Sequence, residues 1–301
     1  MRWAFPPLWE TPGRDGSGRA ILDWSRTVED YYPVSPRPRW GHGLPVHPRI
    51  AAVLEQRRHA YEDALTTLAE HHEALHLIPL DPDPFRPTPF WNNIFFSTLD
   101  AASLVGFLLS RQPRRYLEIG SGHSTLFARY AIAHGRLQTT LASIDPNPRA
   151  SIDALCDHII RLPLEQCDLA IFDDLVAGDV LFFDGSHRVF TNSDVTVFFF
   201  DILPRLKPGV LIHLHDIFLP ADYTPAWNRR LYSEQYLLGA MLLCAAPPFS
   251  VVLPNYFVCS DPALSTRVHD LFRNDSGPGI PFRYNNGAGI PGVSFWIETQ
   301  S

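Results

Sequence analysis

Hydrophobic positions along the middle of the chain alternate between two periods, and this alternation predicts its elements. Short apolar runs rich in β-branched and aromatic residues predict strands over 115–119, 139–144, 157–161, 179–183 and 209–214. Stretches with apolar residues at helical spacing lie between them and predict helices over 124–134, 148–155, 168–176 and 192–206. Alternating strands and helices form βαβ units, so we expect an α/β protein with a doubly wound, mostly parallel sheet.

The pattern changes towards the end of the chain. After a predicted helix over 229–245, two further apolar strands are expected over 249–258 and 293–298, separated by a Gly/Pro/Asn-rich loop. No full crossover helix is evident between these two strands, which predicts an antiparallel pair, joined as a hairpin, at the edge of the sheet. The sheet would therefore have seven strands, with an antiparallel last strand.

The first 90 residues differ from the rest, because they are rich in proline and tryptophan. Within them only residues 48–72 show helical spacing, and a further helix over 96–110 leads into the first strand. We therefore divide the chain into an N-terminal Pro/aromatic-rich extension (1–90) and a main domain (91–301). So many aromatic side chains argue against a solvated tail. Two interpretations stay open: a cap over the active site, or an arm that joins a homodimer.

Composition and charge exclude several classes of protein. The chain of 301 residues is 46% hydrophobic and carries a formal net charge of −7, so no broad basic surface indicates a nucleic-acid partner. Its four cysteines are scattered without a Cys-x-x-Cys pair, which favours reduced thiols and a cytoplasmic location. The longest apolar stretch, 237–253, is interrupted by two prolines, and we expect no membrane span.

The first predicted strand runs into a glycine-rich turn that opens a helix, Leu117-Glu-Ile-Gly-Ser-Gly-His-Ser-Thr125. Gly120 and Gly122 allow the backbone to approach a ligand closely, and the helix start offers free N–H groups. Glu118 stands where a carboxylate can accept from a ribose hydroxyl or a ligand ammonium group. Ser124 and Thr125 lie near the place of the third glycine of dinucleotide-binding turns, so the pattern predicts a different nucleotide ligand.

Ligands of doubly wound sheets bind beyond the carboxyl ends of the strands. After the second strand comes Asp145, which predicts a carboxylate for both ribose hydroxyls; a helix N-cap before Pro146 is the alternative. The fourth and fifth strands end in a set of two acids and two histidines: Asp184, His187, His215 and Asp216. Carboxylates suit Mg²⁺, and an added imidazole widens the choice to Mn²⁺ or Fe²⁺. In the alternative interpretation, the acids cap turns and the histidines brace them.

Together these motifs resemble class I S-adenosylmethionine-dependent methyltransferases. Within that class the chain is similar to the small-molecule O-methyltransferase branch, which includes macrolide-sugar O-methyltransferases and cephalosporin-hydroxylase-like proteins. The resemblance covers residues 90–300 and rests on four segments in order, with a typical helix at 234–238: 117–125, 143–146, 178–187 and 206–217. The first 90 residues resemble no family.

The resemblance implies roles for individual residues. The methionine part of the cofactor would lie against Glu118, Gly120, Ser121 and Gly122, with Asp145 on its ribose. The cofactor set also includes Ser124, Thr125 and Asp184.

In metal-using relatives, the acid of the fourth strand and two residues ending the fifth hold Mg²⁺. The corresponding residues here are Asp184, His215 and Asp216, and His215 departs from the usual acid or amide. Some relatives have a general-base lysine three residues after the fourth-strand acid, an offset that His187 occupies. An imidazole near its ordinary pKa suits this role. His215 is the second candidate for the base.

We therefore expect methyl transfer from S-adenosylmethionine to a small-molecule acceptor, most simply a hydroxyl, with a histidine base and with Mg²⁺ or another divalent metal as the assisting ion. Three alternatives remain: a metal-free N-methyltransferase, a metal-dependent oxidoreductase or hydroxylase, and a binding module without catalysis.

Overall fold

The computed structural model describes residues 36–148, 151–274, 279–282 and 292–300. Most of the proline- and tryptophan-rich part of the extension therefore lies outside the described residues, and so does most of the Gly/Pro/Asn-rich loop. The cap and dimer-arm interpretations of the extension stay predictions.

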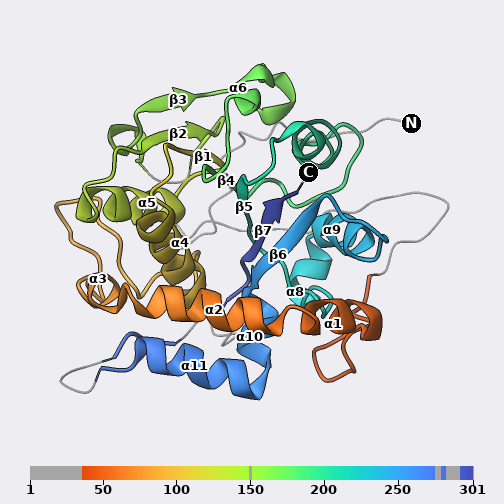
Figure 1. Cartoon of the computed structure of the whole chain (residues 1–301). Coiled ribbons are helices and arrows are strands. Elements are labelled where there is room, and N and C mark those ends of the chain that lie inside the picture. Colours follow the sequence, from red (N-terminus) through yellow and green to blue (C-terminus); the bar gives the residue numbers. More distant parts are fainter. Residues whose placement is uncertain (1–35, 149–150, 275–278, 283–291, 301) are drawn as a thin grey trace, which may run out of the picture.

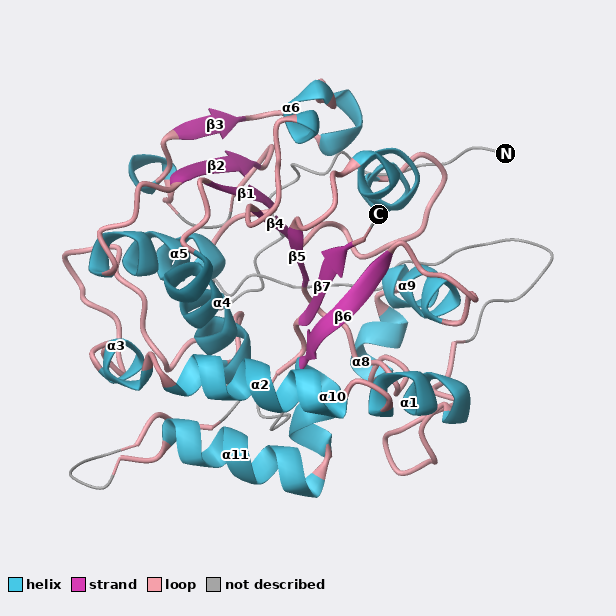
Figure 2. Cartoon of the chain, in the orientation of Figure 1, coloured by secondary structure: helices cyan, strands magenta, loops and turns pink. Residues whose placement is uncertain are grey.

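Seven strands form one sheet in the order β3-β2-β1-β4-β5-β7-β6 (Figures 1 and 2). All neighbouring pairs from β3 to β5 are parallel, and β7 is antiparallel to both of its neighbours. The bounds are β1 Arg115–Ile119, β2 Thr140–Ile144, β3 His158–Ile160, β4 Val180–Phe183, β5 Leu211–Leu214, β6 Phe249–Pro254 and β7 Phe295–Thr299. The predicted doubly wound, mostly parallel sheet with an antiparallel last strand is confirmed.

Helices cover both faces of this sheet, as right-handed crossovers require when the strand order runs outward in both directions from β1 and β4. On one face α4 and α5 pack together, whereas α6 and the helical segment after β4 lie on the other (Figure 1). Before and around β1 to β3 come α1 Pro48–Glu55, α2 Arg58–Ala69, α3 His72–His76, α4 Thr98–Arg111, α5 His123–His134 and η1 Asp153–Leu155. Later elements are η2 Leu164–Gln166, α6 Ala170–Asp173, α7 Asp194–Val197, η3 Phe198–Ile202, η4 Leu203–Arg205, α8 Pro225–Arg229, α9 Glu234–Leu242, α10 Asn255–Ser260 and α11 Pro262–Phe272.

Two predicted helices differ from the structure, each where the chain contacts a distant segment. The helix expected over 48–72 is divided into α1, α2 and α3, and at the first break the Arg57 guanidinium donates to the Val251 carbonyl of β6 at 2.8 Å. The helix expected over 229–245 begins only at Glu234, as α9, because the turn that precedes it brings the Ser233 N–H to the carbonyl of His187. Over 148–155 the described residues form only the short η1.

The hairpin predicted for the last two strands is wrong. β6 ends at Pro254 instead of residue 258, and the chain then forms α10 and α11 before returning as β7 between β5 and β6. An apolar run as short as Tyr256–Val258 fits a buried helix and a strand equally well, which explains the error. The sequence does carry a signal for α11: Pro262 is at its start, and the Asp261 carboxylate accepts from the N–H groups of Ala263 and Leu264.

The described part of the extension shares the main hydrophobic core. Leu54, Tyr61 and Leu68 are fully buried in the same cluster as the sheet residues. α2 crosses α4 at Gly106, where a Cβ would collide with the Leu68 side chain, so the two helices approach as closely as a glycine allows. No helix of the described ranges is both long and apolar enough to cross a membrane.

We expect Leu68→Ala to lower the free energy of unfolding by about 2–5 kcal/mol, because it leaves a cavity between α2 and α4. Leu77→Ala, at a side chain that is 62% exposed, is the matched control and should change it by less than about 0.5 kcal/mol. Urea denaturation of both variants measures the difference. Equal small effects would mean that α2 is not part of the cooperative core.

Candidate functional site

The glycine turn joins the ends of three strands. Gly120 has a φ of +79°, and a Cβ there would overlap the carbonyl oxygen of Asp184. The Gly120 N–H donates to Ile144 in β2 at 2.9 Å, and the Asp184 N–H donates to Ile119 in β1 at 2.9 Å. Only glycine permits this contact, so the turn and the end of β4 form a single unit.

Asp145, at the end of β2, fixes the rim of this turn. Its Oδ2 accepts from the backbone N–H of Ser121 at 2.9 Å and from the Ser121 hydroxyl at 3.0 Å, while its Oδ1 accepts from Asn147. Oδ2 thus already accepts two hydrogen bonds, whereas Oδ1 can accept a second one. The half-exposed carboxylate therefore keeps acceptor capacity towards solvent beside the turn.

Glu118 lies beneath the turn and is fully buried. Its carboxyl group accepts from the hydroxyls of Thr125 at 2.5 Å, Ser124 at 3.3 Å and Tyr116 at 3.3 Å. Burial raises the pKa of Glu118 to about 8, although these hydroxyl donors oppose the shift. The group thus ties the first turn of α5 to β1.

At the ends of β4 and β5 the structure brings Asp184, His187 and Asp216 together. The Nε2 of His187 is 3.2 Å from Asp184 Oδ1 and 3.6 Å from Asp216 Oδ2. One donor atom from each of the three residues falls within 4.8 Å of the other two, a spacing that could hold a metal ion. His215 lies alongside, with its Nδ1 3.6 Å from Asp184 Oδ1 and 3.7 Å from Asp216 Oδ1.

Two of these residues have a left-handed backbone conformation, which an aspartate tolerates at 216 and which is uncommon at His187. His187 has a φ of +61° and Asp216 a φ of +58°, the left-handed region that side chains other than Gly, Asn and Asp rarely enter. Such conformations persist only where the surroundings enforce them, and they cluster at functional sites. At His187 the carbonyl accepts from the N–H groups of Ser233 at 2.7 Å and Glu234 at 3.3 Å.

Each histidine is backed by a buried carboxylate from outside the predicted motifs. The Nδ1 of His187 is 2.6 Å from Oε1 of Glu234 in α9, and the Nε2 of His215 is 3.5 Å from Oδ2 of Asp100 in α4. Burial lowers the pKa of His187, but the charges of Glu234 and Tyr232 and the hydrogen bonds with Asp184 and Glu234 raise it well above its ordinary value. His215 shows the same balance: burial lowers its pKa, and the neighbouring carboxylates raise it well above the usual range.

Asp100 is also a structural node, and the sequence analysis did not identify it. Its fully buried carboxylate accepts from the N–H groups of Val293 at 3.0 Å and Ser294 at 2.7 Å, and from the Asn255 amide at 2.8 Å. The available signal was an acid near the start of an otherwise apolar helix. Glu234 lay in a segment noted only as typical of the family resemblance, without a role.

The donor groups fit a divalent cation. Oδ1 of Asp216 and Nδ1 of His215 are buried and have no hydrogen-bond partner among the described residues. Two carboxylates with an imidazole are a donor set for Mg²⁺ or Mn²⁺ and for later transition metals. The three residues whose donor atoms lie closest together are Asp184, His187 and Asp216. The sequence predicted His215 as the third metal ligand instead of His187, and the metal ligands stay a prediction.

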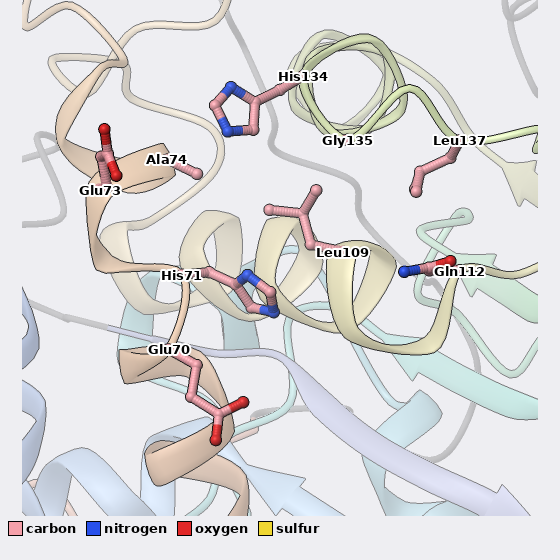
Figure 3. A pocket seen from close by; sticks show the side chains of 9 residues that line it. All are labelled: Glu70, His71, Glu73, Ala74, Leu109, Gln112, His134, Gly135 and Leu137. Atoms are coloured by element: carbon pink, nitrogen blue, oxygen red, sulfur yellow. The ribbon is translucent and has the colours of Figure 1, made fainter.

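A surface hollow of about 320 Å³ lies away from this chemistry (Figure 3). It is lined by residues near the carboxyl-terminal ends of α4 and α5 and by α3, including Leu109, His134 and Ala74. Since α4 rises about 1.5 Å per residue over its 14 residues, this end is about 20 Å from the end that carries Asp100. The hollow therefore does not belong to the candidate site.

Comparison with known proteins identifies the central region. The family model of a methyltransferase domain matches residues 117–217, from the glycine turn to just beyond Asp216. No curated protein matches the chain. Solved structures with a similar fold include the SAH-bound methyltransferase PaMTH1 of Podospora anserina (17% identity, TM-score 0.42, covering 87% of this chain and 100% of that one). Another is the O-methyltransferase of Bacillus cereus in complex with SAH (14% identity, TM-score 0.40, covering 79% and 91%).

The matched residues contain the glycine turn and Asp145. They also contain the ends of β4 and β5 with the histidine–carboxylate group, by which we mean Asp184, His187, His215 and Asp216. The strand order and the turn agree with this match. Residues 117–217 of the chain therefore match a methyltransferase domain.

Proposed function

We propose that the protein transfers the methyl group of S-adenosylmethionine to a hydroxyl of a small-molecule acceptor, with His187 as the general base. The contact between Gly120 and the Asp184 backbone carries this proposal, because it places the cofactor turn beside the histidine–carboxylate group. A methyl donor over the turn and an acceptor over the ends of β4 and β5 would then meet. Holding two reactants in line is worth about 7–11 kcal/mol of the barrier.

On the cofactor side, Gly120, Ser121 and Gly122 supply the close backbone surface, and Asp145 offers its oxygens to the ribose hydroxyls. Glu118, Ser124 and Thr125 would fix the start of α5 through their hydrogen bonds and so hold the glycine turn in place. The burial of Glu118 and its three hydroxyl partners support this positioning role more than a direct contact with the cofactor.

On the acceptor side, the Nε2 of His187 would remove the hydroxyl proton, with His215 as the second candidate. Asp184 and Asp216 would hold a divalent cation, with His215 completing the set, because the Nε2 of His187 cannot bind a cation and accept a proton at the same time. Such an ion would lower the pKa of the acceptor hydroxyl. A cation held there would occupy the carboxylate oxygens that otherwise favour a proton on Nε2, and this would favour His187 as a base. The cytoplasmic location and the homodimer stay predictions.

Calorimetry with SAH tests the cofactor site. The protein should bind SAH, and Gly120→Ala should weaken binding at least about 100-fold, because the new methyl group pushes the turn away from Asp184. Gly178→Ala is the matched control: it also has a positive φ, +88°, but no atom lies within 4 Å of the added Cβ. Its affinity should stay within about twofold, given that its strain of about 1–2 kcal/mol acts on folding. Absence of binding to the unaltered protein would overturn the proposed function.

Glu118→Gln should change how stability depends on pH. The folded pKa of Glu118, about 8, exceeds the ordinary glutamate value of 4.5, so the stabilisation from Glu118 is complete below pH 4.5 and is lost as the pH rises towards 8. The glutamine has no proton to lose, and the melting temperature of the variant relative to the unaltered protein should rise between these values. Thermal melting from pH 5 to 9 measures this, with the exposed Glu165→Gln as a control. A constant difference would show that Glu118 does not titrate as proposed.

Methyl transfer from radiolabelled S-adenosylmethionine to a panel of hydroxyl and amine compounds separates the chemical alternatives. For a hydroxyl acceptor, we expect His187→Ala to lower kcat by about 10²–10⁴-fold, the usual contribution of a general base. Treatment with EDTA followed by Mg²⁺ or Mn²⁺ should abolish and then restore the rate. Full activity on an amine after chelation and in His187→Ala would instead support metal-free N-methylation. Iron in the purified protein with oxygen consumption would support an oxidoreductase.

A further inference from the structure

The first turn of α9 is hydrogen-bonded to the segment that carries His187. Ser233 donates its N–H to the His187 carbonyl at 2.7 Å, and its hydroxyl accepts from the N–H of Val189 at 2.9 Å. Glu234 N–H reaches the same His187 carbonyl at 3.3 Å. These bonds hold His187 in its left-handed conformation, which costs about 1–3 kcal/mol and would otherwise relax.

The ring of His187 is fixed as firmly as its backbone. Its Nδ1 lies 2.6 Å from Oε1 of Glu234, and both side chains are nearly or fully buried. Tyr232 stacks on the imidazole at a centroid distance of 4.4 Å and an interplanar angle of 27°. Rotation of the ring would break the short bond and the stack together.

A carboxylate can only accept a hydrogen bond, so Glu234 keeps a proton on Nδ1 and leaves Nε2 as the nitrogen that faces Asp184 and Asp216. We propose that Glu234 is a positioning residue that fixes the tautomer and the ring orientation of His187, so that Nε2 meets the acceptor hydroxyl. The inference rests on the proposed methyl transfer.

The second histidine lacks this arrangement. The Nε2 of His215 is 3.5 Å from Asp100, and neither of its ring nitrogens makes a hydrogen bond to the described residues. The Phe96 ring packs against it at a centroid distance of 5.2 Å. A directed bond of 2.6 Å therefore distinguishes His187 and favours it over His215 as the base.

Glu234→Gln tests the positioning role with little change in side-chain size. The amide can donate to Nδ1 and so stabilise the other tautomer, the effect that makes an aspartate-to-asparagine change in the Ser-His-Asp triad so damaging. Nitrogen-15 NMR of histidine-labelled protein, with His187→Asn to assign the signals, should show a hydrogen-bonded Nδ1 proton in the unaltered protein and its loss in Glu234→Gln. With a hydroxyl acceptor, kcat should fall at least about 100-fold while KM changes less than about threefold.

Two further measurements separate positioning from general damage. Glu234→Gln should keep its SAH affinity within about twofold and remain folded by thermal melting. Glu234→Asp, which restores a carboxylate on a shorter arm, should recover part of the Nδ1 signal and of kcat. An unchanged Nδ1 signal or an unchanged kcat in Glu234→Gln would overturn the inference. The NMR signal is read on the free protein and therefore tests the positioning role independently of cofactor binding. Failure of the unaltered protein to bind SAH would instead count against the proposed function.

Discussion

The contact between Gly120 and the Asp184 backbone is the constraint on which the site depends. It brings the turn after β1 against the end of β4, and the N–H groups of Gly120 and Asp184 tie these segments to β2 and β1. A larger residue at position 120 would separate the cofactor turn from the carboxylates that face the acceptor. In the proposed function, cofactor binding and acceptor chemistry therefore share one backbone geometry.

The chemistry at the strand ends is held from outside the sheet. Glu234 reaches His187 from α9, and Asp100 approaches His215 from α4, so two buried acids from different parts of the chain support the two histidines. A buried carboxylate is costly unless it is paired, and here each pairing is with a group at the site. The helices thus contribute to the site as well as to the core.

The sequence was sufficient for the parts that depend on local pattern. Alternating apolar runs predicted the parallel strands, and the carboxyl ends of those strands placed Asp145, Asp184 and Asp216 on one edge of the sheet. It was insufficient where distant segments meet. Glu234 is 47 residues from His187, and no local period indicates that they touch.

Helix breaks were missed for the same reason. The break at Arg57 satisfies a carbonyl in β6, nearly two hundred residues away, and the turn before α9 satisfies His187. Helical spacing continues through both places, so periodicity alone predicted unbroken helices. The metal set is a similar case, because only the folded chain distinguishes the place of His187 from that of His215.

The position of β7 has a consequence for how the protein is made. β7 lies between β5 and β6 but follows both in the chain, and the residues just before it, Val293 and Ser294, are the ones that bond to Asp100. During synthesis, the edge of β5 beside His215 stays unpaired until β7 leaves the ribosome. An exposed strand edge invites pairing with other chains. The nascent protein is therefore most prone to aggregation in the interval just before its candidate site is completed.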